Sequence, residues 1–564
     1  MPLDLTGPYY KSIFGLWSIT HSIEIMSIIF LAFVIIFLMS FKEIVKPFNK
    51  LKRKTCIILF FIIVFGFLLR NTDYIYGSGY DGLFYLTTAK LMFEKNIQAH
   101  NCAIGNLDEC YLYNQHLAPA GYPYLIYLSF LIFGVNDINA MMISSILGTL
   151  NILLVFLLCY LLFKNEKIGL YSSLIFALIP FDIILSSSGA VRTTSIFFTG
   201  LTFLFFVISL KSGKIRLWSL TAITLSYSIY VRQENFLMIF PMFLLLIFTK
   251  NIGFRSLRNL NINFLKKYSI PLFIFIFSQI PVQHWVLFSD LGPNRFVIEN
   301  FPLLAFLFLK LLFFDPNITR VYYNIFASLA LFLSLALFLD KKSKNKKILA
   351  VFWVWFMSFF TIYSLYFQCH DFPKIFCTEY VRFAQGLNLP YAILSGAFVF
   401  SLERFIKIRL RMIFPLIFSL LLISSFFLPN SVYTFKTSFF NDARLDDGYI
   451  GYDIQAMKAT PNNSIVFISQ ASIQHLDYFN GDKRIIIDTN IFTFNNYSYT
   501  LSALKNNRGK PIYIIKFVDC PYPDIAMCKF IYDNFELNEI NKFGYVTLYK
   551  MQGKNDFIDK IINN

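Results

Sequence analysis

Residues 77–96 read GSGYDGLFYLTTAKLMFEKN, and residues 115–123 read QHLAPAGYP. Long apolar segments flank this region on both sides, so it forms a large loop between them. Within it, Asp81 stands between Tyr80 and Gly82, at the start of a segment whose apolar residues recur with roughly helical spacing. We therefore expect a helix that begins near Asp81, where the helix dipole favours an ionised carboxylate. Spacing alone leaves two roles open for Asp81, a helix cap or a reactive group.

The composition is that of a protein that crosses a membrane many times. Hydrophobic residues make up 56% of the 564 residues, and the mean hydropathy is +0.57. They come in blocks of about 17–25, the length needed to cross a hydrocarbon core. We predict an all-α polytopic membrane protein with about twelve transmembrane helices. Their approximate bounds are 22–40, 55–70, 138–163, 168–186, 193–210, 216–231, 235–249, 268–288, 320–339, 348–367, 386–402 and 411–428.

Basic residues gather in the short loops on one side of these spans. The formal net charge is +17, yet residues 430–564 carry 14 Lys and Arg against 14 Asp and Glu, so the whole excess lies in the apolar part. This is the positive-inside pattern of membrane proteins rather than a surface for nucleic acid. It predicts a multi-pass protein of the cell membrane, with the N-terminus and the region beyond residue 429 outside.

Three regions follow from these patterns. Residues 1–54 hold an N-terminal span and a cytoplasmic loop, and residues 55–429 hold the other spans with a large first outer loop over 71–137. Residues 430–564 alternate β-rich runs with helical patterns, which predicts an extracytoplasmic α/β accessory domain with a mostly parallel sheet. The expected strands are 465–469, 484–488, 512–517 and 545–549, and the expected helices are 447–458, 472–479, 497–505 and 524–535.

Two apolar stretches, 122–133 and 301–314, are too short to span a bilayer. Pro119 precedes the first, Pro123 lies at its start, and the second contains Lys310. We expect both to be helices that lie along the membrane surface or pack inside the protein.

Six of the eight cysteines form three local pairs of equal spacing. The pairs are Cys102 with Cys110, Cys369 with Cys377, and Cys520 with Cys528. The charge pattern places all three outside, where disulfides persist, so local disulfides are the simplest interpretation. Metal binding is the alternative, although no pair has the CxxC spacing typical of zinc.

Four tracts of the chain resemble segments of one family. In order they are SGYDGLFYLTTAKLMFEKN (78–96), the segment 116–158 that begins HLAPAGYP, SSSGAVRTTSIFFTGLTFLFF (186–206) and LSYSIYVRQENFLMIFP (225–241). Their order and spacing resemble the GT-C-type glycosyltransferases that use polyprenyl-phosphate sugars, the group related to protein O-mannosyltransferases and lipid A aminoarabinose transferases.

The resemblance implies a GT-C-like transmembrane domain over residues 55–429. It also implies an inverting enzyme that moves a sugar from a polyprenyl-phosphate donor to a protein, lipid or surface-glycan acceptor at the outer face. In that family the Asp at the position of Asp81 opens a helix and serves as the general base. An inverting enzyme needs one such base, together with cations that hold the departing phosphate.

Few outer cations could hold that phosphate, and arginine suits bidentate contact best. We favour Arg192 and Arg232, each at the outer end of a span within a matched tract. Snorkelling at the membrane interface is the alternative role for both. Tyr80, His116, Lys310 and Arg320 are further candidates for substrate contact, and Arg70 is another outer cation.

The chain departs from the family at the span that opens with Arg192. Many relatives carry an acidic residue there, and this chain has Thr193 and Thr194 instead. Because that acid helps relatives to bind a divalent metal or the acceptor, its absence puts metal dependence in doubt. No cofactor is certain and a divalent metal stays open. The expected partners are the polyprenyl-phosphate-linked sugar, membrane lipids and an unidentified acceptor, without nucleic acid.

Two other classes of protein remain open. One is a multi-pass lipid or solute transporter, although the sequence shows neither the internal repeats nor the broken helices typical of such folds. The other is a non-catalytic membrane receptor in which the outer α/β domain serves as the sensor.

Overall fold

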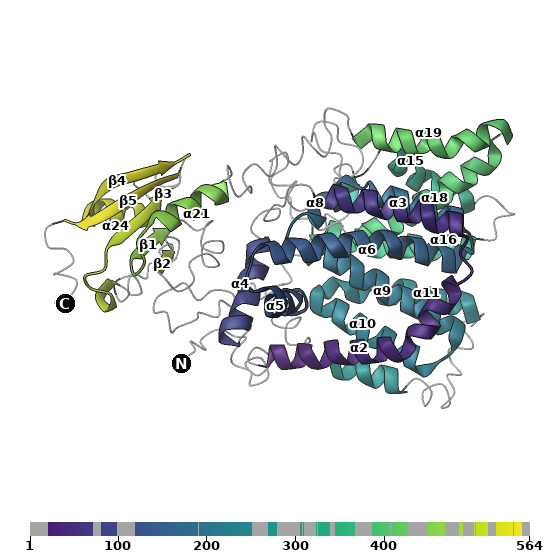
Figure 1. Ribbon diagram of the computed structural model, residues 1–564, viewed down its shortest axis with the longest axis horizontal. Helices are drawn as coiled ribbons and strands as arrows, with labels where there is room; N and C mark the ends of the chain where they lie inside the picture. Colours follow the sequence, from purple (N-terminus) through teal and green to yellow (C-terminus); the bar gives the residue numbers. More distant parts are fainter. Residues whose placement is uncertain are drawn as a thin grey trace.

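The structure is a computed structural model. It describes residues 21–71, 81–96, 98, 119–189, 191–250, 269–278, 305–306, 308–309, 323, 325–338, 345–366, 386–406, 408–426, 449–468, 484–488, 501, 504–516, 526–544 and 546–554. Within these residues a large helical body is followed in sequence by a five-stranded sheet with its helices (Figure 1).

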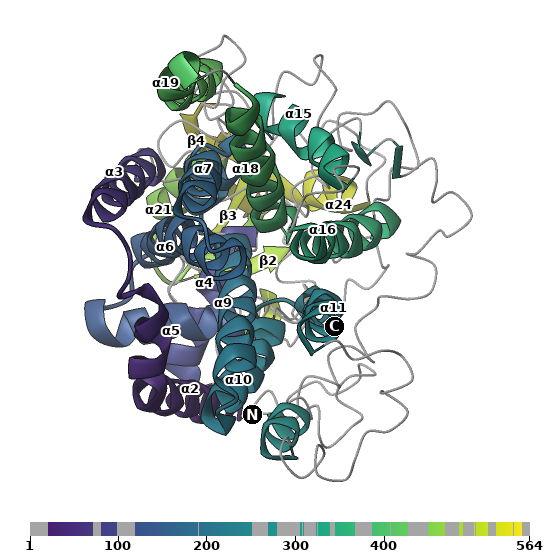
Figure 2. The same cartoon turned by 90° about the vertical axis from the view of Figure 1, so that its right-hand side faces the viewer.

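The helical body is built from long apolar helices and short 3-10 turns. They are α2 (Ser22–Val45), η1 (Lys46–Phe48), α3 (Arg53–Arg70), α4 (Asp81–Lys95), α5 (Gly121–Phe133), α6 (Ile138–Phe163), α7 (Glu166–Ala177), α8 (Pro180–Ser186), α9 (Val191–Ser212), α10 (Ile215–Val231), η2 (Gln233–Met238), α11 (Ile239–Lys250), α15 (Ile325–Leu333), η5 (Ser334–Phe338), α16 (Lys346–Tyr366), α18 (Asn388–Phe405) and α19 (Ile408–Phe426). In the most apolar stretch of α9, 83% of the residues are buried inside the protein, whereas in that of α2 with η1 only 22% are. Helix α9 is therefore central and α2 peripheral, as the end-on view of Figure 2 shows.

The helices bear out a multi-pass membrane protein. Helices overlap each of the twelve predicted segments. Among the described residues, four helices are long and apolar enough to cross a membrane, namely α2 with η1, α6, α9 and α16, and the bent pair α7 and α8 makes up to five. The number twelve stays a prediction.

The segment 168–186, expected as one span, is broken. Helix α7 ends at Ala177, α8 starts at Pro180, and the two are bent by 64°. Proline has no N–H for an intrahelical bond and disfavours the helical conformation in the residue before it. Ile179 is accordingly extended, so the expectation of unbroken helices was wrong at this position.

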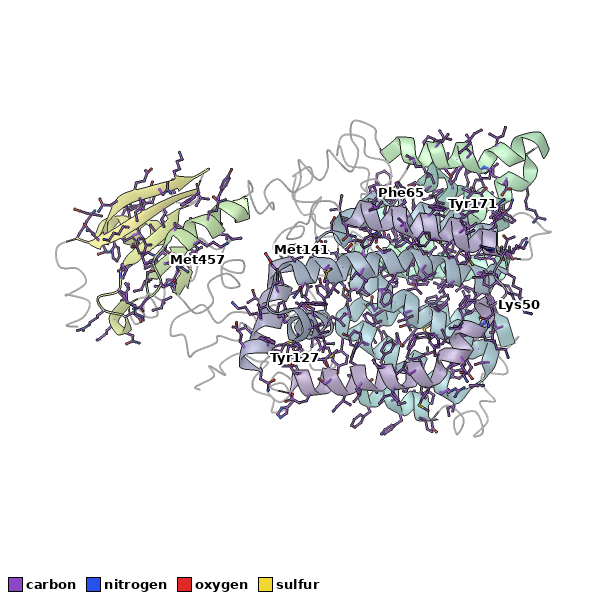
Figure 3. All side chains as sticks on the ribbon, viewed as in Figure 1. Lys50, Phe65, Tyr127, Met141, Tyr171 and Met457 are labelled. Atoms are coloured by element: carbon purple, nitrogen blue, oxygen red, sulfur yellow. The ribbon has the colours of Figure 1, made fainter. Side chains whose placement is uncertain are left out.

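The predicted inner loops that the structure describes, 41–54, 164–167, 211–215 and the part 403–406, lie at one end of the helical body. Glu43 of α2 forms an ion pair of 2.6 Å with Lys214, which precedes α10. Lys167 of α7 forms one of 2.5 Å with Glu403 of α18. Figure 3 shows Lys50 at this end and Met141 toward the opposite end, where α4 and α5 lie. Among the described residues, the loops that the charge pattern assigns to one side therefore share one end of the structure.

Helices α4 and α5 pack together at the other end. Helix α4 begins at Asp81, as the sequence predicts, and α5 confirms the predicted short apolar helix. The ring of Tyr85 meets that of Tyr122 edge to face, with centroids 5.3 Å apart. Aromatic pairs favour this geometry. The predicted helix over 301–314 falls largely outside the described residues.

Close backbone contact fixes α5 against α10. A Cβ atom on Gly121 would lie 2.7–2.8 Å from backbone atoms of Tyr230 and Val231. We expect Gly121→Ala to lower the free energy of unfolding by about 1–3 kcal/mol, because backbone cannot yield as a side chain can. Denaturant unfolding of the purified protein in detergent measures this.

Gly200→Ala is the matched control for that prediction. The nearest atom to its new Cβ would be the end of the flexible Leu389 side chain, at 2.9 Å. We expect a smaller loss of stability than for Gly121→Ala. Equal losses would contradict the account of the α5–α10 contact.

Beyond the helical body lies an α/β unit with a mixed sheet. Its elements are α21 (Tyr449–Ala459), β1 (Ile465–Ile468), β2 (Ile485–Asp488), β3 (Ile512–Lys516), α24 (Ala526–Asn534), β4 (Phe535–Phe543) and β5 (Val546–Gly553). The strand order is β2-β1-β3-β5-β4. β1 pairs in parallel with β2 and β3, whereas β5 is antiparallel to β3 and β4. The expectation of a mostly parallel sheet was therefore wrong.

Strand β4 is the element that the sequence analysis missed. Its sequence FELNEINKF is largely polar and exposed, and it pairs only with β5 at the edge of the sheet. Gly544, with φ +55°, lies in the short turn between the two strands. A glycine with positive φ in a two-residue turn is typical of a β-hairpin, and this is the signal that could have located β4.

The predicted disulfides lie outside the described side chains. Cys102, Cys110, Cys369, Cys377 and Cys520 fall outside the described residues, and of Cys528 only the backbone within α24 is described. Cys56 and Cys159, which the sequence places inside spans, are free.

Candidate functional site

The first turn of α4 lies at the end of the helical body where α4 and α5 pack together, opposite the described inner loops. Asp81 is the first residue of α4, and its side chain is outside the described part. Tyr85, one turn further, contacts Tyr122 and lies within electrostatic reach of Arg232. The Tyr122 hydroxyl donates to the Ala140 carbonyl at 3.2 Å. This bond ties the start of α5 to α6, and Gly121 beside it lies against the backbone of Tyr230 and Val231 at the end of α10, just before Arg232.

Arg232 occupies a turn that neighbouring elements hold in place. It is extended between α10 and η2, and its guanidinium is paired with the Glu234 carboxylate. The Asn235 amide donates to the Ser228 carbonyl at 2.8 Å, and Ser195 of α9 donates to the Asn235 side-chain oxygen at 2.9 Å. The turn that carries Arg232 is thereby fastened to the first turns of α9.

Tyr363 of α16 interacts electrostatically with both predicted arginines. Arg192, the second residue of α9, is fully buried. The Tyr363 hydroxyl lies in the combined electrostatic field of Glu234, Arg232 and Arg192. We call these four residues the Tyr363 cluster. Within it, the Arg232 guanidinium is paired with the Glu234 carboxylate, and Arg192 lies at the start of α9, the helix to which Ser195 fastens the Arg232 turn.

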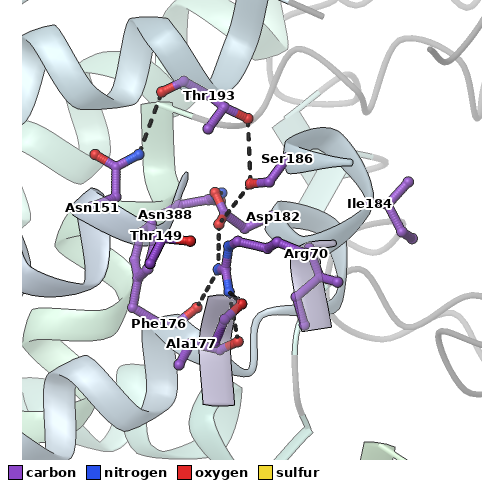
Figure 4. Close-up of polar contacts among 12 residues, drawn as sticks. Arg70, Thr149, Asn151, Phe176, Ala177, Asp182, Ile184, Ser186, Thr193 and Asn388 are labelled. Carbon is purple, nitrogen blue, oxygen red and sulfur yellow. Dashed lines mark hydrogen bonds and ion pairs between the residues drawn. The ribbon is translucent and has the colours of Figure 1, made fainter. Parts of the chain in front are cut away.

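A second polar group is the Arg70–Asp182 network (Figure 4). Arg70 at the end of α3 and Asp182 in α8 form an ion pair of 2.6 Å, and both side chains are completely buried. Arg70 also donates to the carbonyls of Phe176 and Ala177, at 3.4 and 3.2 Å. The Asn388 amide of α18 donates to Asp182 at 3.3 Å. Arg70, which the sequence placed among the outer cations, is thus committed to an internal carboxylate.

The network extends to Thr193, at the start of the span where many members of the resembled family carry an acidic residue. The Ser186 hydroxyl lies 3.5 Å from both the Asp182 carboxylate and the Thr193 hydroxyl. The Asn151 amide donates to the Thr193 carbonyl at 3.3 Å. Asp182 is therefore the acid that lies near Thr193, but Arg70 already neutralises it. That donor set does not fit a resident divalent metal.

Sequence reasoning missed Asp182, although a signal was present. A carboxylate inside an apolar run, here LIPFDIIL, is costly in a membrane and needs a partner. The partner lies 112 residues earlier in the chain, at a distance that local pattern analysis does not reach.

The structure describes some of the predicted site residues and leaves others outside the described part. Arg192 is the second residue of α9, and Arg232 stands in the turn that Ser195 of α9 holds, so the two predicted arginines lie on neighbouring elements. Tyr80, His116, Lys310 and Arg320 lie outside the described residues. Among the described residues, no group of three or more His, Cys, Asp or Glu side chains could hold a metal ion.

Comparisons with known proteins concern the family and the fold. The family model described as dolichyl-phosphate-mannose-protein mannosyltransferase matches residues 118–285. No curated protein sequence matches the chain.

Solved structures resemble the chain over most of its length. ArnT from Cupriavidus metallidurans in the apo state has a TM-score of 0.54 at 11% identity, and the match covers 88% of this chain and 97% of ArnT. The same protein bound to undecaprenyl phosphate has a TM-score of 0.53 at 11% identity, with the same coverage. The apo oligosaccharyltransferase of Archaeoglobus fulgidus has a TM-score of 0.50 at 13% identity and covers 90% and 75%. The chain therefore has the fold of the GT-C-type glycosyltransferases that use polyprenyl-phosphate sugars.

Proposed function

We propose that the chain is an inverting membrane glycosyltransferase that moves a sugar from a polyprenyl-phosphate donor to an acceptor. The observation that supports this most directly is the placement of α4, which begins at Asp81, beside the Tyr363 cluster. A structure with the same fold binds undecaprenyl phosphate, which suits a donor of this kind.

The reaction needs one base and one anion site. The acceptor oxygen attacks the anomeric carbon while the bond from that carbon to the donor phosphate breaks. Asp81 takes the acceptor proton, and the polyprenyl phosphate leaves with the bonding electron pair. Arg192 and Arg232 stabilise the negative charge that develops on this phosphate.

The proposal includes an orientation. The inner loops share one basic end of the structure, so α4 and the Tyr363 cluster would lie at the opposite, outer end. The α/β unit would then be an extracytoplasmic accessory domain, and the three cysteine pairs would form disulfides there. Membrane lipids would surround the apolar helices and accommodate the donor tail. The acceptor would be a protein, a lipid or a surface glycan.

Transfer of labelled sugar from polyprenyl-phosphate donors in isolated membranes tests the proposal. Arg192→Gln should lower transfer about 10²-fold, because one preorganised partner of the departing phosphate is removed. The folded fraction, measured by gel filtration in detergent, should be close to that of the wild type.

Lys50→Gln is the control, since it removes an exposed cation at the opposite end of the helical body. It should leave transfer unchanged. No transfer by the wild-type chain from any of a panel of polyprenyl-phosphate sugars would overturn the proposed function. Equal loss in both variants would overturn the role of Arg192.

A further inference from the structure

We propose that Arg70 and Asp182 are positioning residues that fix the start of α9, and with it Arg192, for contact with the donor phosphate. The part that concerns the donor rests on the proposed function. The part that concerns the placement of α9 rests on the contacts of the Arg70–Asp182 network alone.

The first step is the break between α7 and α8. A helix end exposes backbone carbonyls, and inside a membrane these groups must be satisfied by the protein itself. Arg70 donates to the carbonyls of Phe176 and Ala177 at the end of α7, and to the carboxylate of Asp182 in the first turn of α8. One guanidinium therefore holds both sides of the 64° bend.

The second step is the connection of this bend to its surroundings. Asn388, the first residue of α18, donates to Asp182 at 3.3 Å and accepts from the Tyr323 hydroxyl at 2.7 Å. The network thus ties α3, α8 and α18 together inside the body. A buried ion pair adds little net stability over apolar packing, so a role in fixing one arrangement is the better account of it.

The third step is the short path from α8 to α9. Ser186 lies between Asp182 and Thr193, and Thr193 follows Arg192 directly. A Cβ atom on Gly148 of α6 would lie 2.2 Å from the Ser186 hydroxyl and 3.1 Å from the Thr193 methyl. Helix α6 therefore packs closely against this turn, and a shift of α8 is passed on to the first turn of α9.

Arg70→Lys is the informative variant. Lysine keeps the charge that pairs with Asp182 but lacks the planar fork that also holds the two carbonyls. Hydrogen exchange of the amides of residues 191–196 should accelerate about 10-fold, since their local opening becomes easier. The Kd for undecaprenyl phosphate should rise about 10-fold, the effect of one weakened charge-assisted contact.

Ser186→Ala is the second variant, in case Arg70→Lys reduces the yield of folded protein. It leaves the ion pair intact and removes only the hydroxyl between Asp182 and Thr193. We expect changes in the same direction as for Arg70→Lys, but smaller.

Tyr171→Phe is the matched control. It removes a buried hydrogen bond of 3.2 Å to Glu403 from the middle of the same helix α7. Exchange over 191–196 and the Kd should both match the wild type. All measurements use the full chain in detergent micelles.

The outcomes separate the two parts of the proposal. Unchanged exchange over 191–196 in Arg70→Lys, or an equal change in Tyr171→Phe, would overturn the positioning role. Faster exchange with an unchanged Kd would overturn its importance for the donor. If the wild-type chain binds no undecaprenyl phosphate while exchange responds as expected, the proposed function fails and the placement of α9 by the network stands.

Discussion

Asp81→Asn is expected to lower sugar transfer by about 10²–10⁴-fold, the usual contribution of a general base. Asparagine is close to aspartate in size but cannot accept a proton from the acceptor. The position supports this role because α4 begins at Asp81 and its next turn lies within reach of Arg232. The measurement is the initial rate of label transfer in membranes with equal amounts of folded protein.

The same substitution separates catalysis from helix capping. Asparagine and aspartate cap helices about equally well, so a role limited to capping predicts full activity and unchanged stability. Asp137→Asn is the matched control, because Asp137 caps α6 at the same end of the helical body. We expect that variant to be as active as the wild type. Full activity of Asp81→Asn would remove Asp81 as the base.

Asp182→Ala is expected to cost about 3–5 kcal/mol of stability, the effect of leaving one partner of a buried ion pair without the other. Both side chains are completely buried, so water cannot compensate the Arg70 charge. The measurement is reversible unfolding of the purified chain in mixed micelles.

The double variant Arg70→Met with Asp182→Leu tests this explanation. It removes both charges and fills much of their volume, so it should be more stable than Asp182→Ala. Full recovery is not expected, because the carbonyls of Phe176 and Ala177 lose their donor. A double variant less stable than Asp182→Ala would show that the uncompensated charge is not the cause.

Much of the candidate site could be predicted because its signals are local. The helical spacing after Asp81 and the position of Arg192 and Arg232 at span ends are properties of short segments. The fold then placed the two arginines on neighbouring elements, the start of α9 and the turn before η2, which Ser195 and Asn235 join. Tyr363 could not be predicted, because its membership depends on how α16 packs against distant helices.

In the α/β unit, too, some elements could be predicted from local sequence and others depend on tertiary pairing. Strands β1, β2 and β3 are short apolar runs, which buried strands require, and they lie where the sequence predicts. Strand β4 owes its structure to pairing with β5, and its polar residues carry no burial signal of their own. The sheet is mixed because β5 runs antiparallel to both β3 and β4, and the reversal between β4 and β5 is made by the turn at Gly544 rather than by composition.

The sequence by itself determined that the chain crosses a membrane several times and that a helix begins at Asp81, because hydrophobic length and periodicity act within a few turns of chain. Only the tertiary structure decided that Arg70 pairs with Asp182, that the predicted span 168–186 bends at Pro180, and that the Tyr363 cluster exists. A buried charge requires a partner but does not specify which one. The choice among partners more than a hundred residues apart is made by the packing of whole helices.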